Sequence, residues 1–201
     1  MSDARNAVIG RPREFDVDDA LERAMRVFWE RGYEGASLVD LTTAMGITKP
    51  SMYAAFGNKE QLFRRAVQRY AEGPGHYAKL ALEEPTARAV AEAFLRGAVG
   101  TTTSPGDPAG CLSVQGALAS GDGGRPARDL LAGWRNDTNR QLEERFRRAI
   151  TEGDLPHDAD PGRLARFTMT MAFGIAVQAA GGLRGEQLDD VVDMALRTWG
   201  P

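Results

Sequence analysis

Cysteine and histidine are scarce in this sequence, which contains one cysteine and two histidines among 201 residues. The single cysteine, Cys111, excludes an intramolecular disulfide and a structural zinc site made of cysteines, and it fits a reducing cytoplasm. His76 and His157 lie too far apart in the sequence to suggest a metal site by their spacing. We therefore expect a cytoplasmic protein without a metal or a cofactor.

Long apolar runs are also missing, because no stretch approaches the ~18 apolar residues that a membrane-spanning helix needs. The N-terminal segment MSDARNAVIGRPREF is too polar for a secretory signal. Positive charge is not in excess, since 25 lysines and arginines stand against 28 aspartates and glutamates, which gives a net charge of −3. Any contact with nucleic acid must therefore come from a local patch of donors.

Sequence signatures of catalysis are absent as well. There is no glycine-rich phosphate loop after a strand, no histidine–carboxylate metal spacing and no Gly-x-Ser-x-Gly turn. The stretch GDGG at 121–124 lies between helices and indicates only a turn. Since no pattern of residues carries a reaction, we expect that the protein is not an enzyme.

Helix signals dominate what the sequence does contain, and strand signals are almost absent. Four helices are expected between residues 16 and 70, and their capping residues are Asp16, Ser37, Thr48 and Asn58. Glycines at 32, 35, 46 and 57 end the first three helices. Asp40 and Gln61 each follow a cap by three residues, which is the spacing of a capping box. The pattern indicates an all-α fold.

The second and third of these helices are short, and the turn Gly46-Ile47-Thr48 joins them, which is the sequence form of a helix-turn-helix. Met52 and Phe56 are expected to face inward, so that the N-terminal end of the third helix stays exposed. Such an end enters the major groove of DNA. The side chains that it would present to phosphates and base edges are Thr48, Lys49, Ser51 and Tyr53.

A further contact is expected at the start of the fourth helix. Lys59 and the free N–H groups there form an anion site that suits a backbone phosphate. Less specific interpretations remain open. A helix pair with a glycine turn can be a plain αα-hairpin, and Tyr53 can be a packing residue.

The stretch from Phe28 to Phe63, FWERGYEGASLVDLTTAMGITKPSMYAAFGNKEQLF, closely resembles the N-terminal DNA-binding domain of tetracycline-repressor-like (TetR-type) transcriptional regulators. The marks of the resemblance are Gly-Tyr-x-Gly-x-Ser at 32–37, the Met-Gly-Ile-Thr-Lys turn at 45–49, and Tyr-x-x-Phe-x-x-Lys-Glu at 53–60. It covers roughly residues 14–70, a third of the chain.

This resemblance implies an all-helical homodimer, a double-stranded DNA operator with two-fold symmetry, and a C-terminal domain that binds a small molecule and thereby releases DNA. Matching positions place Ser37 and Thr43 of the second helix among the DNA contacts, together with the third-helix residues and Lys59. Arg11 and Arg13 stand where such proteins often place a basic arm. The expected function is that of a DNA-binding transcriptional regulator, and more specifically of a repressor released by an effector.

The chain is accordingly divided into a helix-turn-helix domain with its N-terminal arm at 1–57, a connecting helix at 58–75 and a larger ligand-binding and dimerisation domain at 76–201. Gly73-Pro74-Gly75 breaks the connecting helix. Further helices are expected from Thr86, at about 111–119, at 126–151, from Pro161 to about 181, and at 186–199. The arginines and glutamates of the helix at 126–151 are expected to face outward. The loop SPGDPAG occupies 104–110.

The last two helices differ from the others in their apolar pattern. Apolar residues of the helix from Pro161 lie on nearly every side, so it must be covered from two directions. Small residues such as Ala172, Gly174 and Ala176 allow a second helix to approach closely. We infer that the helices near 161–181 and 186–199 pair with their copies in a four-helix dimer interface; an oversized monomer core is the alternative. A dimer would hold two recognition helices about 34 to 36 Å apart.

A small-molecule effector of unknown identity is expected between the helices of the larger domain. The candidates by position are Phe94, Cys111, Gln115, Trp134, Asn136, Met169 and Phe173, and ordinary core packing explains each of them equally well. Two alternatives remain: Cys111 could sense oxidants or electrophiles with its thiol, or the protein could be a helical protein-interaction adaptor. A steep loss of DNA affinity with added salt separates a regulator from an enzyme or an adaptor.

Overall fold

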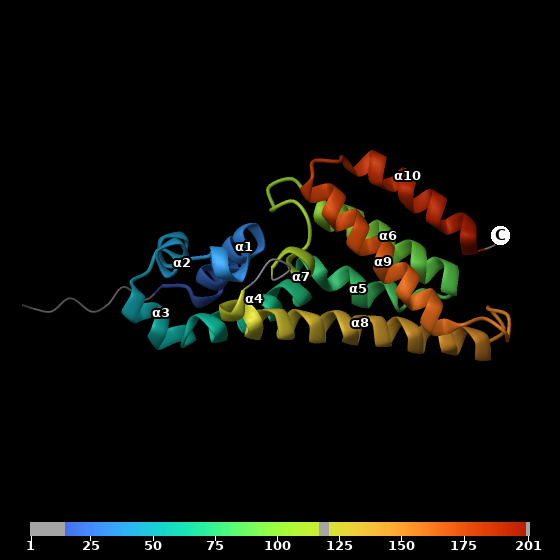
Figure 1. Cartoon of the computed structure of the whole chain (residues 1–201), viewed down its shortest axis with the longest axis horizontal. Coiled ribbons are helices and arrows are strands. Elements are labelled where there is room, and N and C mark those ends of the chain that lie inside the picture. The colour runs from blue at the N-terminus through green and yellow to red at the C-terminus, as the bar shows by residue number, and fades with distance from the viewer. Residues whose placement is uncertain (1–14, 117–120, 200–201) are drawn as a thin grey trace, which may run out of the picture.

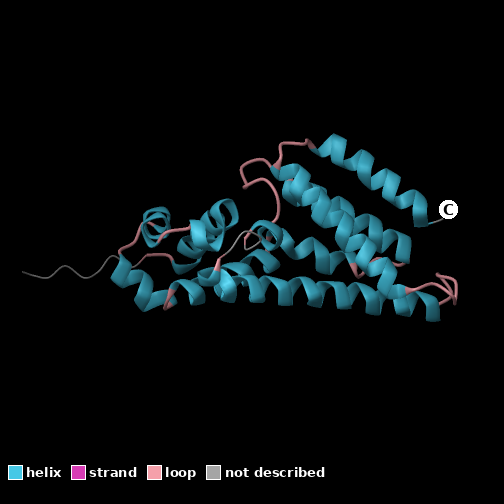
Figure 2. Ribbon diagram, in the orientation of Figure 1, coloured by secondary structure: helices cyan, strands magenta, loops and turns pink. Residues whose placement is uncertain are grey.

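The computed structural model describes residues 15–116 and 121–199, and every regular element in that part of the chain is a helix (Figure 2). The all-α prediction is confirmed. The α-helices are α1 Val17–Gly35, α2 Leu38–Met45, α3 Lys49–Phe56, α4 Lys59–Glu72, α5 Tyr77–Ala81, α6 Ala87–Thr102, α7 Leu112–Gln115, α8 Arg125–Thr151, α9 Pro161–Ala180 and α10 Gly185–Leu196. Short 3₁₀ turns lie at Pro74–His76, Asp122–Gly124 and Arg197–Trp199. Arg11 and Arg13, the predicted basic arm, lie outside the described residues.

The molecule is elongated, as Figure 1 shows, with α1, α2 and α3 at one end and α6, α9 and α10 toward the other. The long helix α8 runs along one side of the molecule. Its first turns contact α4, and it packs on α9 as well. The α4 and α8 helices therefore connect the N-terminal helices with the rest of the molecule.

The predicted helix starts are confirmed by their capping bonds. The side chain of Asp16 accepts the backbone N–H groups of Asp18 and Asp19 at 2.8 and 3.1 Å. Ser37 and Asn58 each form a complete capping box with the residue three positions later. These bonds satisfy backbone donors that a helix start leaves without a partner, so the short helices around the turn have defined first residues.

Gly32 interrupts α1 three residues before its end. Its φ of 68° and ψ of 176° belong to a region that residues with a side chain rarely adopt, which explains why a glycine stands there. The interruption lets the N–H of Tyr33 donate to the carbonyl oxygen of Gly116 at 2.9 Å. The end of α1 is thereby tied to the segment that follows α7.

Two hydrophobic cores fill the molecule. The first core is formed by helices α1, α2, α3, α4 and α7 and by the first turns of α8. Its fully buried aromatic side chains are Phe28, Trp29, Phe63 and Tyr70. The second joins α5, α6, α9 and α10 with the later turns of α8. The division at residues 57 and 75 stays a prediction, and α7, which it assigns to the larger domain, packs in the first core.

Two local expectations differ from the structure. The helix expected at 111–119 is the single turn of α7, and residues 117–119 lie outside the described ranges. All arginines of α8 were expected to face outward, which is wrong for Arg145. This residue is 4% exposed, donates to the carbonyl oxygen of Glu84 at 2.7 Å and lies 4.0 Å from a carboxylate oxygen of Glu152. A long arginine can satisfy a buried carbonyl while its stem packs against apolar neighbours.

Candidate DNA-binding surface and effector cavity

The outer face of α3 is the candidate DNA-binding surface. Met52 and Phe56 are buried in the first core, as predicted, and they fix which side of the helix faces inward. Lys49 and Tyr53 are four residues apart and both exposed, so they lie on the same face of α3. Since 48% of the large Tyr53 side chain is exposed, the alternative that it serves mainly as a packing residue has little support.

Two hydroxyl groups mark the start of α3. Oγ1 of Thr48 accepts the backbone N–H of Ser51 at 3.3 Å and lies 2.9 Å from Oγ of Ser51. A hydroxyl can donate one hydrogen bond and accept two, so both groups keep capacity for a phosphate or a base edge. Their bond to each other also holds them in place beside Lys49.

The two α2 candidates, Ser37 and Thr43, are both exposed but differ in their bonding. The hydroxyl of Ser37 donates to Oδ2 of Asp40 at 2.6 Å within the capping box. Hydrogen bonds from the Ser37 side chain and backbone lower the pKa of Asp40, and Arg31 contributes from 2.7 Å. The hydroxyl of Ser37 is therefore already engaged in capping α2. The hydroxyl of Thr43 makes no side-chain hydrogen bond within the described part of the chain, so it is available for a contact.

Lys59 lies at the first position of α4 and is half-buried. Its Nζ stands 4.6 Å from the centroid of the Tyr33 ring, in cation–π contact. Burial lowers its pKa, although the nearby Glu34 acts in the opposite direction. The capping box of Asn58 and Gln61 leaves the first N–H groups of α4 free, so a cation and backbone donors are grouped at this helix start.

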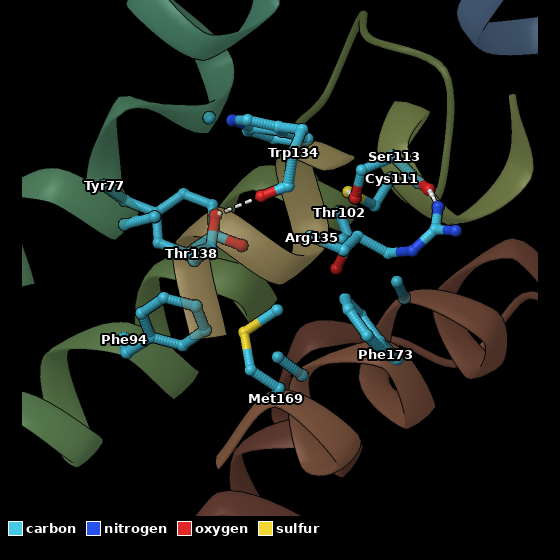
Figure 3. A pocket seen from close by; sticks show the side chains of 14 residues that line it. Tyr77, Phe94, Thr102, Cys111, Ser113, Trp134, Arg135, Thr138, Met169 and Phe173 are labelled. Carbon is cyan, nitrogen blue, oxygen red and sulfur yellow. Dashed lines mark hydrogen bonds between the residues drawn. The ribbon is translucent and has the colours of Figure 1, made fainter. Parts of the chain in front are cut away.

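A narrow cavity lies between α5, α6, α7, α8 and α9, and its free interior of about 30 Å³ has room for about two water molecules. Figure 3 shows Tyr77 and Phe94 on one side of it and Cys111 and Ser113 on the other. The complete lining comprises Gly75, Tyr77, Ala78, Phe94, Thr102, Cys111, Ser113, Trp134, Arg135, Thr138, Met169, Ala172, Phe173 and Ala176. The lining is mostly apolar, with a few polar groups, as in many small-molecule sites.

Five of the seven predicted ligand-site residues line this cavity, namely Phe94, Cys111, Trp134, Met169 and Phe173. Gln115 and Asn136 do not. Asn136 is exposed, and the buried side-chain oxygen of Gln115 has no hydrogen-bond partner among the described residues. Tyr77, Thr102, Arg135 and Thr138 also line the cavity and are not among the residues predicted from the sequence. The signal that could have found Arg135 and Thr138 is helical spacing along α8, because Arg135 follows the buried Leu131 by four residues and Thr138 precedes the buried Leu142 by four.

Cys111 is buried where α4, α7 and the cavity meet. The hydroxyl of Tyr70 donates to its Sγ at 3.3 Å, and Oγ of Ser113 lies at 3.1 Å. Burial raises the pKa of Tyr70, so its hydroxyl stays protonated and remains a donor. The cysteine is thus a hydrogen-bonded part of the cavity wall.

The wall of the cavity is in contact with the N-terminal helices. The ring of Trp134 meets that of Tyr70 of α4 with 5.9 Å between centroids, and Tyr70 meets Trp29 of α1 at 4.8 Å. Nε1 of Trp29 donates to the carbonyl oxygen of Gly110 at 3.0 Å, directly before Cys111. A continuous row of packed rings therefore leads from the cavity to α1.

Apolar side chains remain exposed on α9 and α10. Val177 of α9 is 54% exposed and Met194 of α10 is 67% exposed. No described helix is long and apolar enough to cross a membrane. Nor does the described part of the chain contain a group of three or more His, Cys, Asp or Glu residues that could hold a metal ion.

Comparison with known proteins decides the identity of this fold. Residues 20–66 match the family model described as bacterial regulatory proteins, tetR family, and residues 87–194 match the tetracyclin repressor-like C-terminal domain. The chain belongs to the tetR family of bacterial regulatory proteins. The TetR-type resemblance of the helix-turn-helix is thereby confirmed, and so is the prediction of a DNA-binding transcriptional regulator. Proteins of the TetR family are homodimers.

Individual relatives resemble the chain over nearly its whole length. The HTH-type transcriptional repressor ComR of Escherichia coli is 32% identical over 192 residues, which cover 94% of this chain and 91% of ComR. The TetR-family regulator CifR, solved with a 26 bp double-strand operator DNA, is 48% identical, with a TM-score of 0.90 over 94% of this chain and 100% of the CifR chain. A putative TetR regulator from Rhodococcus sp. RHA1 is 39% identical, with a TM-score of 0.63 over 91% of this chain and 98% of its own. These comparisons do not favour the thiol-sensor or adaptor alternatives.

Proposed function

We propose that this protein is a repressor that binds a two-fold symmetric operator as a homodimer and leaves it when a small molecule enters the cavity. The observation that carries the proposal is the outer face of α3, where Lys49 and Tyr53 lie exposed over the buried Met52 and Phe56. The similarity to CifR, which was solved with operator DNA, and to the repressor ComR supports it. As a regulator of transcription it would act in the cytoplasm.

Each predicted DNA-contact residue has a role in this proposal. Lys49 and Tyr53 reach base edges and phosphates in the major groove, since they share the exposed face of α3. The hydroxyls of Thr48, Ser51 and Thr43 bond to phosphates. Lys59, together with the N–H groups at the start of α4, binds a phosphate of the flanking backbone. Ser37 contributes mainly by capping α2.

We propose α9 and α10 as the dimer interface. Their exposed Val177 and Met194 are apolar surface that a second copy would cover, and the exposed Gly174 leaves room for a helix to approach. A dimer of this kind would hold two α3 helices one turn of DNA apart, about 34 to 36 Å.

The effector would act by changing the position of α4. The cavity is narrow, so a molecule of more than a few atoms must displace side chains of its wall. Trp134 is one of these, and it packs on Tyr70 of α4, about three turns from the start of the helix at Lys59. A ligand that binds more tightly to the displaced arrangement would favour a spacing of the two α3 helices that does not fit the operator.

The experiment that tests the proposal begins with selection of bound duplexes from random DNA. The expected result is a sequence with two symmetric half-sites that binds one dimer, and an affinity that falls steeply as salt is added. Selection that recovers no sequence, or an affinity insensitive to salt, would contradict the proposal.

A further inference from the structure

Among the residues that the structure describes, Arg135 is the one arginine or lysine that lines the cavity, and the rest of the wall is apolar or uncharged at neutral pH. Its guanidinium stands on the same side of the cavity as Cys111 and Ser113, and one N–H donates to the carbonyl oxygen of Ser113 (Figure 3). Burial lowers the pKa of this guanidinium, which shows that the surroundings disfavour its charge. The cation therefore occupies a partly dehydrated place.

No carboxylate within the described ranges 15–116 and 121–199 forms an ion pair with Arg135. This sets it apart from Arg96 on α6, which reaches Asp189 and Asp193 at 3.0 and 2.7 Å, and from Arg140 on its own helix, which pairs with Asp137 at 3.0 Å. The hydrogen bond to the Ser113 carbonyl supplies no opposite charge. A partly buried cation without a carboxylate partner is an unfavourable arrangement unless an anion joins it.

We propose that the effector of this cavity is an amphipathic monocarboxylate, whose carboxylate binds Arg135 and whose apolar part lies among Tyr77, Phe94 and Met169. The planar guanidinium presents parallel N–H groups that match the two oxygens of a carboxylate. One cation balances one negative charge, whereas a phosphate monoester would carry close to two. The inference rests on the proposed function, because it names the ligand class of the same cavity.

Binding would also act on the segment that ties the cavity to α1. The guanidinium that would receive the carboxylate is the one that holds the carbonyl oxygen of Ser113 in α7. The neighbouring Gly116 accepts the N–H of Tyr33 at 2.9 Å, at the end of α1. A carboxylate that draws the guanidinium away from Ser113 loosens α7. The hydrogen bond between Tyr33 and Gly116, which links α7 to the N-terminal helices, is then weakened as well.

The test uses the full-length dimer and matched pairs of probes, hexanoate and octanoate against hexanol and octanol, with octyl phosphate as a third head group. Calorimetry measures each dissociation constant for the wild type, for Arg135→Gln and for Arg128→Gln, a control on an exposed arginine of the same helix. We expect each carboxylate to bind the wild type and the control at least about tenfold more tightly than its alcohol, because the alcohol cannot form the charged hydrogen bond to Arg135. In Arg135→Gln this preference falls to about one, while alcohol binding is kept.

Other results would overturn the proposal. Equal binding of carboxylate and alcohol by the wild type, tighter binding of octyl phosphate, or no binding of any probe each contradicts it. If Arg135 only holds α7 through Ser113, Arg135→Gln weakens acid and alcohol alike and leaves their ratio unchanged. Should Arg135→Gln fail to fold, the ratio of alcohol to carboxylate dissociation constants in the wild type still decides whether the cavity prefers a carboxylate. The proposed function is contradicted by a different result, namely that no operator is found. If an alcohol binds and releases the operator, the carboxylate proposal fails and the proposed function stands.

Discussion

Tyr70 and Trp134 meet edge to face, with 5.9 Å between their ring centroids and 87° between their planes. Tyr70 is buried in α4, the helix that follows the recognition helix, whereas Trp134 belongs to α8 and lines the cavity. A molecule that displaced Trp134 from the cavity wall would therefore act directly on α4.

Replacing Tyr70 with Phe removes the hydroxyl that donates to Sγ of Cys111 at 3.3 Å and keeps the ring contacts with Trp29 and Trp134. The free energy of unfolding should fall by about 1 kcal/mol, because one buried hydrogen bond is lost. Urea denaturation followed by circular dichroism measures this change. An unchanged midpoint would mean that the hydroxyl–thiol contact adds nothing to stability.

Local signals in the sequence predict the helices and their caps well. Each of these signals depends on residues within three or four positions of each other, so it can be recognised without the fold. Examples are the capping boxes at Ser37 and Asn58 and the end of α1 near Gly32. The inward side of α3 followed from Met52 and Phe56 for the same reason.

The cavity could be predicted only in part. Arg135 and Arg145 stand on the buried stripe of α8, although their charge favours an outward position. The carbonyl oxygens that accept their hydrogen bonds come from distant parts of the chain, so only the fold shows them. Tyr77 comes from α5, a short helix whose side chains join the cavity through tertiary packing. Asn136 follows Arg135 directly, but one position along a helix turns a side chain by about 100°, and it points to solvent.

The capping box of α2 makes stability depend on pH. The folded state lowers the pKa of Asp40, mainly through hydrogen bonds from Ser37, so the stabilisation is present above the ordinary aspartate range and is lost as the pH falls through about 4 and below. Asp40→Asn lacks this titration. Its stability relative to the wild type should therefore rise as the solution is acidified, and thermal unfolding at several pH values measures it. A constant difference across that range would contradict the assignment.

Lys59→Gln should weaken binding to every duplex by a similar factor, because a phosphate contact carries no sequence information. The slope of log affinity against log salt should fall by about 1. Fluorescence anisotropy with labelled duplexes measures both. Lys79→Gln, an exposed lysine of α5, serves as the matched control and should leave the slope unchanged. A loss confined to one duplex sequence would assign Lys59 to base readout instead.

Charged substitutions on α9 and α10 test the dimer interface. Val177→Glu combined with Met194→Glu should yield a folded monomer, because burying two carboxylates per protomer without partners opposes association. Sedimentation analysis reports the mass, and circular dichroism reports the fold. Leu80→Glu changes an equally exposed apolar residue of α5 and should stay dimeric. A dimeric double variant would place the interface elsewhere.

The affinity of Lys49→Ala and Tyr53→Ala for the selected operator tests the central claim most directly, which is that the outer face of α3 binds DNA. Each variant should lose about 1 to 3 kcal/mol of binding free energy, while Lys79→Ala retains wild-type affinity. Both side chains are exposed, so neither loss should be accompanied by unfolding. Wild-type affinity in both α3 variants would contradict the account.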